Sequence, residues 1–331
     1  MALLPVSETS KSINPEPNPN LMENKPRQPT SLQGLLRFSM DVTRAEDAPL
    51  ETLGPMDEER KKFLEGALSS MTVDVVEILQ TQIKTLRDVD RLTEAEVANY
   101  INALDTILDY VDNIDTANDF HKIGGFLILY PCLKSRFSKI RAITCELIGV
   151  LCQNNPYCQK VILENEFVPF LLNIIETDDD VQVIVKALFA LGGIIRENTE
   201  GVSQFFQYRG LSILFNSLSK FNNESVTIKI CFLLSSLSRL FPDIKEQLVK
   251  LGFIHQLLTL FMMERCPSHE YVLSFLVTIM DNYPPAVKEC IKFRYNVKDI
   301  VQRYMNSLRN SEYFEEEELC RRILHMINAE R

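Results

Sequence analysis

RAITCELIGVL (residues 141–151) is one of four similar helical stretches that decide the fold of this chain. The other three are VKALFALGGII (185–195), IKICFLLSSLS (228–238) and YVLSFLVTIMD (271–281). Their starts lie 43 or 44 residues apart, and breaks and shorter helical stretches separate them. A period in the low forties with helical patterning is typical of armadillo and HEAT solenoids. The repeat therefore predicts an all-α, armadillo-like right-handed superhelical solenoid with capping helices.

The third stretch shows how each of these helices meets the core. Its apolar residues follow the i, i+3, i+4, i+7 spacing of one helix face, and they are Ile230, Leu233, Leu234 and Leu237. The second stretch contains Gly192 and Gly193, and we expect this pair to permit close packing between helices. The spacing therefore predicts core residues on one face of every repeat helix.

The repeats divide the chain into four predicted parts. Residues 1–55 hold eight of the fifteen prolines and bury too little apolar surface to offset the entropy of ordering, so we predict a disordered tail. We expect N-terminal capping helices and a degenerate repeat in residues 56–119. Four armadillo-like repeats are expected in residues 120–293, and C-terminal capping helices in residues 294–331. The apolar island SLQGLLRFSM (31–40) within the tail is a chance cluster, a helix that docks on the body, or a recognition motif.

Charge and cysteine usage limit the partners and the compartment. The formal net charge of −10 argues against nucleic acid and against anionic membrane surfaces as partners. No apolar run reaches the roughly 18 residues of a membrane span. The start, MALLPVSETSKS, lacks the basic and apolar regions of a secretory signal. The eight cysteines form no CxxC pair, so we predict reduced, buried thiols and a cytoplasmic location.

The sequence lacks the patterns that carry known chemistry. It has no phosphate-binding loop, no GxSxG elbow and no HExxH pair, and its four histidines are scattered. We therefore predict no catalytic residue, no metal, no cofactor and no enzymatic activity. What remains is the concave face that the third helices of an armadillo stack form, which suits a macromolecular partner. The absence of tryptophan argues against an importin-type peptide site.

Seven strings give the chain a family resemblance. They are LQGLL (32–36), MDEERKKFLEGAL (56–68), DNIDTANDF (112–120), IGVLCQNN (148–155), VKALFALGGIIRE (185–197), HEYVL (269–273) and SEYFEEEELC (311–320). Together they resemble the cytosolic armadillo-type nucleotide exchange factors of the seventy-kilodalton heat-shock chaperones. The likeness covers the chain from residue 31 onward. The tail departs from it, because family members have a Gly- and Ser-rich start and this one is rich in Pro and Asn.

The resemblance implies a monomeric co-chaperone without catalytic activity. It would clasp one lobe of the chaperone's ATPase domain, promote ADP release and so promote release of the client protein. The residues implied on its chaperone-binding concave face are Asn113, Asp115, Ala117, Asn118, Gln153, Asn154, Lys186, Arg196 and Lys229. Ala117 and Asn118 are expected in a loop that leaves the first concave helix, where a small residue allows close approach.

The resemblance also gives the apolar island a role. The segment would imitate an unfolded client in the chaperone's peptide groove through Leu32, Leu35, Leu36 and Phe38. The alternative function is that of a generic armadillo adaptor for another protein partner.

Overall fold

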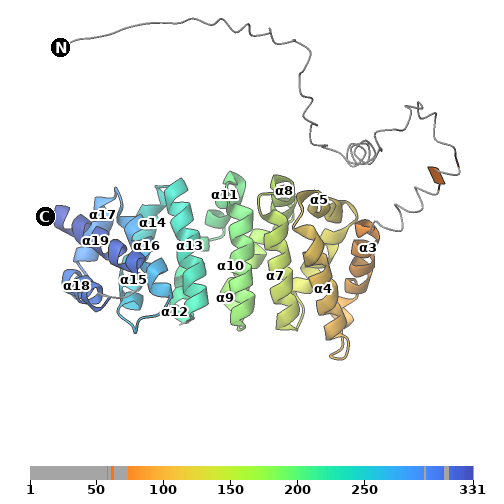
Figure 1. Ribbon diagram of the computed structural model, residues 1–331, viewed down its shortest axis with the longest axis horizontal. Helices are drawn as coiled ribbons and strands as arrows, with labels where there is room; N and C mark the ends of the chain where they lie inside the picture. Colours follow the sequence, from red (N-terminus) through yellow and green to blue (C-terminus); the bar gives the residue numbers. More distant parts are fainter. Residues whose placement is uncertain are drawn as a thin grey trace, which may run out of the picture. The chain divides into compact units, whose positions relative to one another are not determined.

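The computed structural model describes residues 58, 61–62, 74–221, 223–293, 296–308 and 313–330. The chain separates into two units, Met1–Thr72 and Val73–Arg331, and nearly all described residues belong to the second. The described part of that unit contains α-helices and short 3-10 helices and no strand (Figure 1). The predicted all-α, armadillo-like solenoid is confirmed. The predicted division at residues 55, 119 and 293 stays a proposal.

Helices follow one another in sets along the second unit. The first set is α3 (Val75–Leu86), η1 (Val89–Arg91) and α4 (Val97–Val111). The second is α5 (Ile114–Lys122), η2 (Gly125–Ile128), α6 (Leu129–Leu133) and α7 (Ser138–Cys152). The third and fourth are α8 (Pro156–Glu164), α9 (Phe167–Thr177) and α10 (Val181–Ile195), then α11 (Thr199–Gln207), α12 (Gly210–Lys220) and α13 (Glu224–Leu240). The last are α14 (Ile244–Leu251), α15 (Phe253–Phe261) and α16 (Ser268–Met280), then α17 (Pro284–Ile291), α18 (Val297–Ser307) and α19 (Phe314–Ala329).

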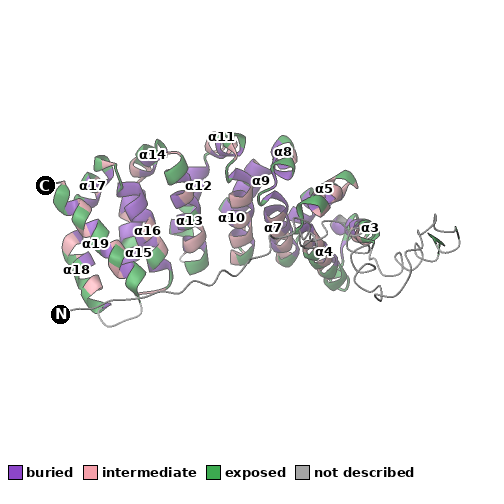
Figure 2. Cartoon of the chain, turned by 45° about the horizontal axis from the view of Figure 1, so that its top comes forward, coloured by how far each residue is buried: buried purple, intermediate pink, exposed green. Residues whose placement is uncertain are grey.

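The long helix that ends each set packs against its counterpart in the next set. Helices α4, α7, α10, α13 and α16 contact one another in that order, as the row in Figure 1 shows. The predicted core face of α13 is confirmed, because Ile230, Leu234 and Leu237 are at most 2% exposed. Helix α16 is buried along almost its whole length (Figure 2). We call the exposed sides of these five helices the third-helix surface.

Two glycines explain how closely α7 and α10 approach. A Cβ on Gly193 would lie 2.8 Å from the carbonyl oxygen of Gly149, and one on Gly149 would lie 2.5 Å from the ring of Phe189. Neither position has room for a side chain, so the predicted close packing is confirmed at Gly193. At Gly192 the prediction was wrong. A Cβ there would meet only a methyl group of Leu233 at 3.7 Å, because this residue faces away from α7.

The turns after α7, α10 and α16 share one backbone feature, which the turns after α4 and α13 lack. Asn154, Glu197 and Asn282 each have a positive φ, between 51° and 54°. Asparagine tolerates this left-handed conformation better than most residues, whereas a glutamate in it is strained. The side chains of Asn155 and Asn198 then cap the next helices by accepting backbone N–H groups at 3.2 and 2.9 Å. These turns hold the C-terminal ends of α7 and α10 in equivalent positions.

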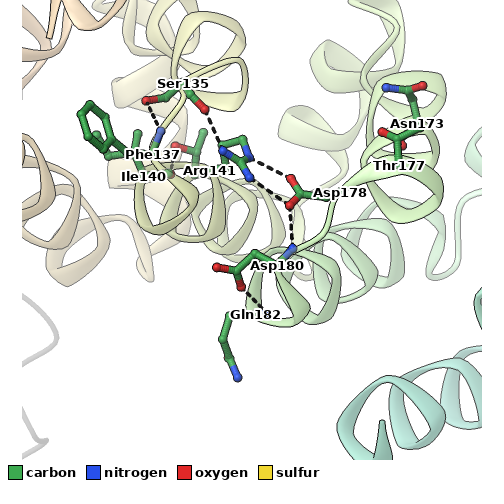
Figure 3. A network of polar contacts seen from close by, with 10 residues as sticks. Ser135, Phe137, Ile140, Arg141, Asn173, Thr177, Asp178, Asp180 and Gln182 are labelled. Atoms are coloured by element: carbon green, nitrogen blue, oxygen red, sulfur yellow. Dashed lines mark hydrogen bonds and ion pairs between the residues drawn. The ribbon is translucent and has the colours of Figure 1, made fainter. Parts of the chain in front are cut away.

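A polar network fixes the other end of α7 against the following set (Figure 3). The guanidinium of Arg141 donates to both carboxylate oxygens of Asp178, at 2.8 and 2.9 Å, and to the carbonyl oxygen of Ser135 at 2.9 Å. The hydrogen bond to Asp178 raises the pKa of Arg141. Asp178 also accepts the backbone N–H of Asp180 at 3.0 Å, and Asp180 caps α10. Because this bidentate pair is mostly shielded from water, it sets the register between α7 and α10.

Candidate functional site

A hollow of about 180 Å³ lies on the third-helix surface between α7, α10 and α13. Three of the residues predicted from the sequence line it, namely Gln153, Arg196 and Lys229. Gln153 and Arg196 are the C-terminal caps of α7 and α10, and both are exposed. Lys229 lies in the second turn of α13. Three side chains from different repeats are thus brought to one place.

The hollow combines an apolar floor with a cationic rim. Arg196 and Lys229 are the charged residues among its described lining, and that lining includes no carboxylate. The Lys229 ammonium lies 5.6 Å from the centroid of the Phe189 ring, within the range of a cation–π contact. No ion pair occupies Arg196 or Lys229 within the described part of the chain. Both charges are therefore available to an acidic partner.

Sequence reasoning missed the apolar residues beside these charges. Phe232 and Leu240 of α13 are 55% and 53% exposed, and both line the hollow. Large aromatic and aliphatic side chains left half exposed beside a pocket are typical anchors of protein–protein interfaces. The sequence does contain a sign that Phe232 is exposed, because this residue lies outside the i, i+3, i+4, i+7 core pattern of its helix. Gly192 also lines the hollow, and its lack of a side chain keeps the floor open.

A buried glutamine holds one edge of the hollow. Gln159 of α8 is 5% exposed, and its Nε2 donates to the carbonyl oxygens of Gly193 at 2.9 Å and Arg196 at 3.2 Å. Its Oε1 accepts the Nδ2–H of Asn198 at 3.1 Å. These bonds satisfy carbonyl groups at the C-terminal end of α10, which lack partners within the helix. The backbone that carries Arg196 is thus fixed by the two neighbouring helices.

Two further predicted residues lie near α7 and α10 but do not line the hollow. Lys186 of α10 forms an ion pair with Glu146 of α7 at 2.5 Å, and both side chains are about one third exposed. Its charge is therefore partly neutralised by the neighbouring helix. Asn154 is exposed in the left-handed turn after α7.

The four predicted residues of the DNIDTANDF string belong to a different part of the surface. They are Asn113, Asp115, Ala117 and Asn118. Asn113 caps α5, since its Oδ1 accepts the N–H groups of Asp115 at 2.9 Å and Thr116 at 3.3 Å. Asp115 is exposed in the first turn of α5, where a carboxylate is favoured by the helix dipole. Of these four, Asn113 and Asp115 are exposed and open to a partner.

The prediction that Ala117 and Asn118 lie in a loop that leaves the first concave helix was wrong. Both belong to α5, and Ala117 is 1% exposed, with its carbonyl oxygen 3.9 Å from the Sγ of Cys158. Asn118 is half-buried and accepts the Nδ2–H of Asn155 at 3.1 Å. A small residue is needed at position 117 because α5 packs against α8 there. An arginine at this position would disturb that packing before it met any partner.

The described part of the chain contains neither a candidate metal centre nor a helix that could span a membrane. Its His, Cys, Asp and Glu side chains form no group of three that could hold a metal ion. No described helix combines the length and the hydropathy that crossing a membrane requires. The predicted peptide-mimic residues Leu32, Leu35, Leu36 and Phe38 lie outside the described residues, as does most of the string MDEERKKFLEGAL (56–68).

Solved structures with a similar fold include armadillo repeat proteins. The chain matches a designed armadillo repeat protein, YIII(Dq)4CqI, with a TM-score of 0.60 and 14% sequence identity, over 76% of this chain and all of that one. It also matches a computationally designed armadillo repeat protein for modular peptide recognition, with a TM-score of 0.59 and 14% identity. At these identities the likeness concerns the fold alone.

Relatives in sequence carry names of one functional group. Hsp70-binding protein 1 of Rattus norvegicus is 30% identical over 90% of this chain and 86% of its own length. The Hsp70 nucleotide exchange factor FES1 of Coccidioides immitis is 29% identical over 33% of this chain and 52% of its own. The nucleotide exchange factor SIL1 of Xenopus laevis is 26% identical over 52% of this chain and 37% of its own.

These relatives correct the predicted cytoplasmic location. SIL1 belongs to the lumen of the endoplasmic reticulum and the FES1 proteins to the cytosol, so the compartments of the relatives are mixed. The cysteine pattern misled the prediction, because thiols buried in helices stay reduced through packing and carry little information about the compartment.

Two family models match adjoining parts of the chain. The model described as nucleotide exchange factor Fes1 matches residues 32–120, and that of the SIL1/FES1/HPBP1 C-terminal domain matches residues 116–237. The second match includes Gln153, Arg196, Lys229 and Phe232 of the hollow. With the match to Hsp70-binding protein 1 along most of both sequences, these models show that the chain belongs to the SIL1/FES1/HPBP1 family.

Proposed function

We propose that this protein is a nucleotide exchange factor of a 70 kDa heat-shock chaperone, Hsp70, and that the hollow docks one lobe of the chaperone's ATPase domain. The observation that carries the proposal is the convergence of Arg196, Lys229 and Phe232 on one hollow in a member of this family. An apolar anchor beside two cations without ion-pair partners suits a surface that presents an apolar side chain among carboxylates.

Exchange then follows from linkage. A partner shifts a conformational equilibrium only by the difference between its affinities for the two states. If the third-helix surface fits the open arrangement of the ATPase lobes better than the closed one, bound protein weakens ADP binding. Reciprocally, nucleotide binding weakens the protein's hold on the chaperone by the same factor. No covalent bond changes, so the protein acts without catalysis and without a cofactor.

The remaining predicted residues extend this docking surface. Asn113 and Asp115 bring it to the start of α5, while Asn154 and Lys186 flank the hollow on α7 and α10. Asn118 and Ala117 support the surface through their packing against α8. One solenoid presents the complete surface, so the protein works as a monomer.

The N-terminal tail contributes a second contact in this proposal. The apolar side chains of Leu32, Leu35, Leu36 and Phe38 enter the chaperone's peptide groove and displace the client protein. The support for this step is the LQGLL string and the start of the Fes1 family match at residue 32.

A capture experiment tests the proposal against the alternative of a generic adaptor. Immobilised full-length protein is incubated with Hsp70 and ADP, and the retained chaperone is then eluted with ATP. The proposal predicts capture with ADP and elution with ATP, and loss of capture in the double variant Arg196→Glu, Lys229→Glu. Lys160→Glu is the matched control, because Lys160 is exposed on α8 and does not line the hollow. Absence of capture, or capture that ATP does not reverse, would favour an adaptor for another protein.

A further inference from the structure

The turn between α15 and α16 places a thiol next to a buried imidazole. Cys266 Sγ lies 3.4 Å from His269 Nδ1 and 3.1 Å from Ser268 Oγ. His269 is 2% exposed and belongs to the first turn of α16. None of the three residues lines the hollow, so the docking surface does not account for their arrangement.

The hydrogen bonds of His269 fix which ring nitrogen carries the proton. Nε2 lies 3.1 Å from the carbonyl oxygen of Phe261, and a carbonyl oxygen can only accept. Nδ1 lies 3.2 Å from both the backbone nitrogen and the carbonyl oxygen of Cys266. Because that carbonyl oxygen already accepts the backbone N–H of His269 at 3.0 Å, the neutral ring with its proton on Nε2 satisfies these contacts and turns the lone pair of Nδ1 toward Cys266. That lone pair accepts the backbone N–H of Cys266 at 3.2 Å and faces the sulfur. A nucleophile, a base and a group that orients the base thus stand in a row, as in activated nucleophiles.

Cys266 also differs from the other cysteines in its access to solvent. Seven of the eight are buried, and Cys266 alone is partly exposed. Burial raises the pKa of the thiols of Cys158, Cys290 and Cys320 to about 12, which makes them poor nucleophiles. Cys266 is therefore the cysteine of this chain with a part of its surface open to solvent in the folded protein.

We propose that Cys266 is a modification site for small-molecule disulfides and that His269 takes up its thiol proton. The sulfur of Cys266 attacks one sulfur of the disulfide, and the new S–S bond forms as the old one breaks. The proton passes to Nδ1 of His269 and then to the departing thiolate. One thiol and one disulfide are consumed, and one thiol and one mixed disulfide are formed, so no other oxidant is needed.

The neighbour of Cys266 connects this site to the end of the solenoid. Arg265 forms an ion pair with the buried Glu316 of α19 at 2.5 Å, and its guanidinium lies 3.4 Å over the ring of Tyr313. A group attached to Cys266 adds volume directly beside this link. Modification is therefore expected to increase the hydrogen exchange of amides in α19.

The test uses Ellman's reagent, an aromatic disulfide, on the native full-length chain. We expect one thiol per chain to react at least about tenfold faster than the others, and mass spectrometry to locate the product at Cys266. Cys266→Ser removes the fast reaction. Cys320→Ser, which changes a buried cysteine of α19, keeps it. The proposal is overturned if another cysteine reacts first or if no thiol reacts before unfolding.

A second variant tests the base. His269→Gln, checked for native helicity, should slow the fast reaction by at least about tenfold, because the thiol proton loses its acceptor. Ser268→Ala should leave the rate within about twofold, since the hydroxyl is not the base. An unchanged rate in folded His269→Gln contradicts the role of the imidazole. Should that variant fail to fold, the mapping of the first-reacting thiol in the wild-type chain still decides whether Cys266 is the site.

Discussion

Phe232→Ala separates binding from folding at the proposed docking surface. The side chain is 55% exposed in the free protein, and we expect a bound chaperone to cover that exposed part. An aromatic side chain buries roughly 200 Å² in full, so about 110 Å² remains for a partner to cover. At ~25 cal/mol per Å² this area corresponds to about 3 kcal/mol. Because alanine keeps Cβ, we expect a loss of about 2 kcal/mol, or roughly 30-fold in affinity.

The assay is isothermal titration of the isolated ATPase domain of Hsp70 with the full-length protein. Phe314→Ala is the matched control, because Phe314 is 73% exposed in α19 and does not line the hollow. Both substitutions remove the same atoms, and both should cost only about 1 kcal/mol of unfolding free energy. An affinity that falls equally in both variants, or in neither, refutes the assignment of Phe232 as the anchor.

Three further predictions follow from the packing and from the proposed second contact. Gly192→Ala should raise the unfolding free energy by about 1 kcal/mol through helix propensity and yet weaken chaperone binding. Gly193→Ala should instead lower the unfolding free energy, because its Cβ would meet a backbone oxygen at 2.8 Å. Chemical denaturation of both variants measures the change in unfolding free energy, and titration with the chaperone measures the change in affinity. A Gly193→Ala variant that is more stable than the wild type would contradict the close packing of α7 against α10. Arg141→Ala should cost about 3 kcal/mol of unfolding free energy, because it leaves the carboxylate of Asp178 shielded and without its cation. A denaturation midpoint equal to that of the wild type would show that the ion pair between Arg141 and Asp178 does not stabilise the fold. Deletion of residues 31–40 should leave nucleotide release unchanged and slow the release of a fluorescent client peptide from Hsp70, so equal client release with and without the segment would argue against the second contact.

The fold could be predicted because its signal is periodic and repeated. Apolar spacing places Ile230, Leu234 and Leu237 on one helix face, and the same pattern returns after 43 or 44 residues. A helix that must bury such a face needs a neighbour of the same kind, which leads directly to a stack. The direction that a single glycine faces is a property of two packed helices. For this reason the pattern could not distinguish Gly192 from Gly193.

The candidate site could be predicted only in part. Gln153 and Arg196 lie near the ends of matched strings, Lys229 lies near the start of the third repeat stretch, and the structure gathers all three around one hollow. Phe232 was missed because the site residues were sought among polar and charged positions, and an apolar side chain outside the core pattern was not considered. Ala117 was misplaced because a loop was expected there, although Asn113 with Asp115 two residues later is also typical of a helix start. Exposure depends on neighbouring helices that one stretch of sequence does not contain.

The measurement that tests the central claim most directly is the rate at which Hsp70 releases a fluorescent ADP analogue, followed by stopped flow. The proposal predicts that the wild-type protein accelerates release and that the double variant Arg196→Glu, Lys229→Glu loses most of the acceleration while remaining folded. The Lys160→Glu control should accelerate release as the wild type does. Acceleration that survives both charge reversals would contradict docking at the hollow, and no acceleration by the wild-type protein would contradict the exchange function itself.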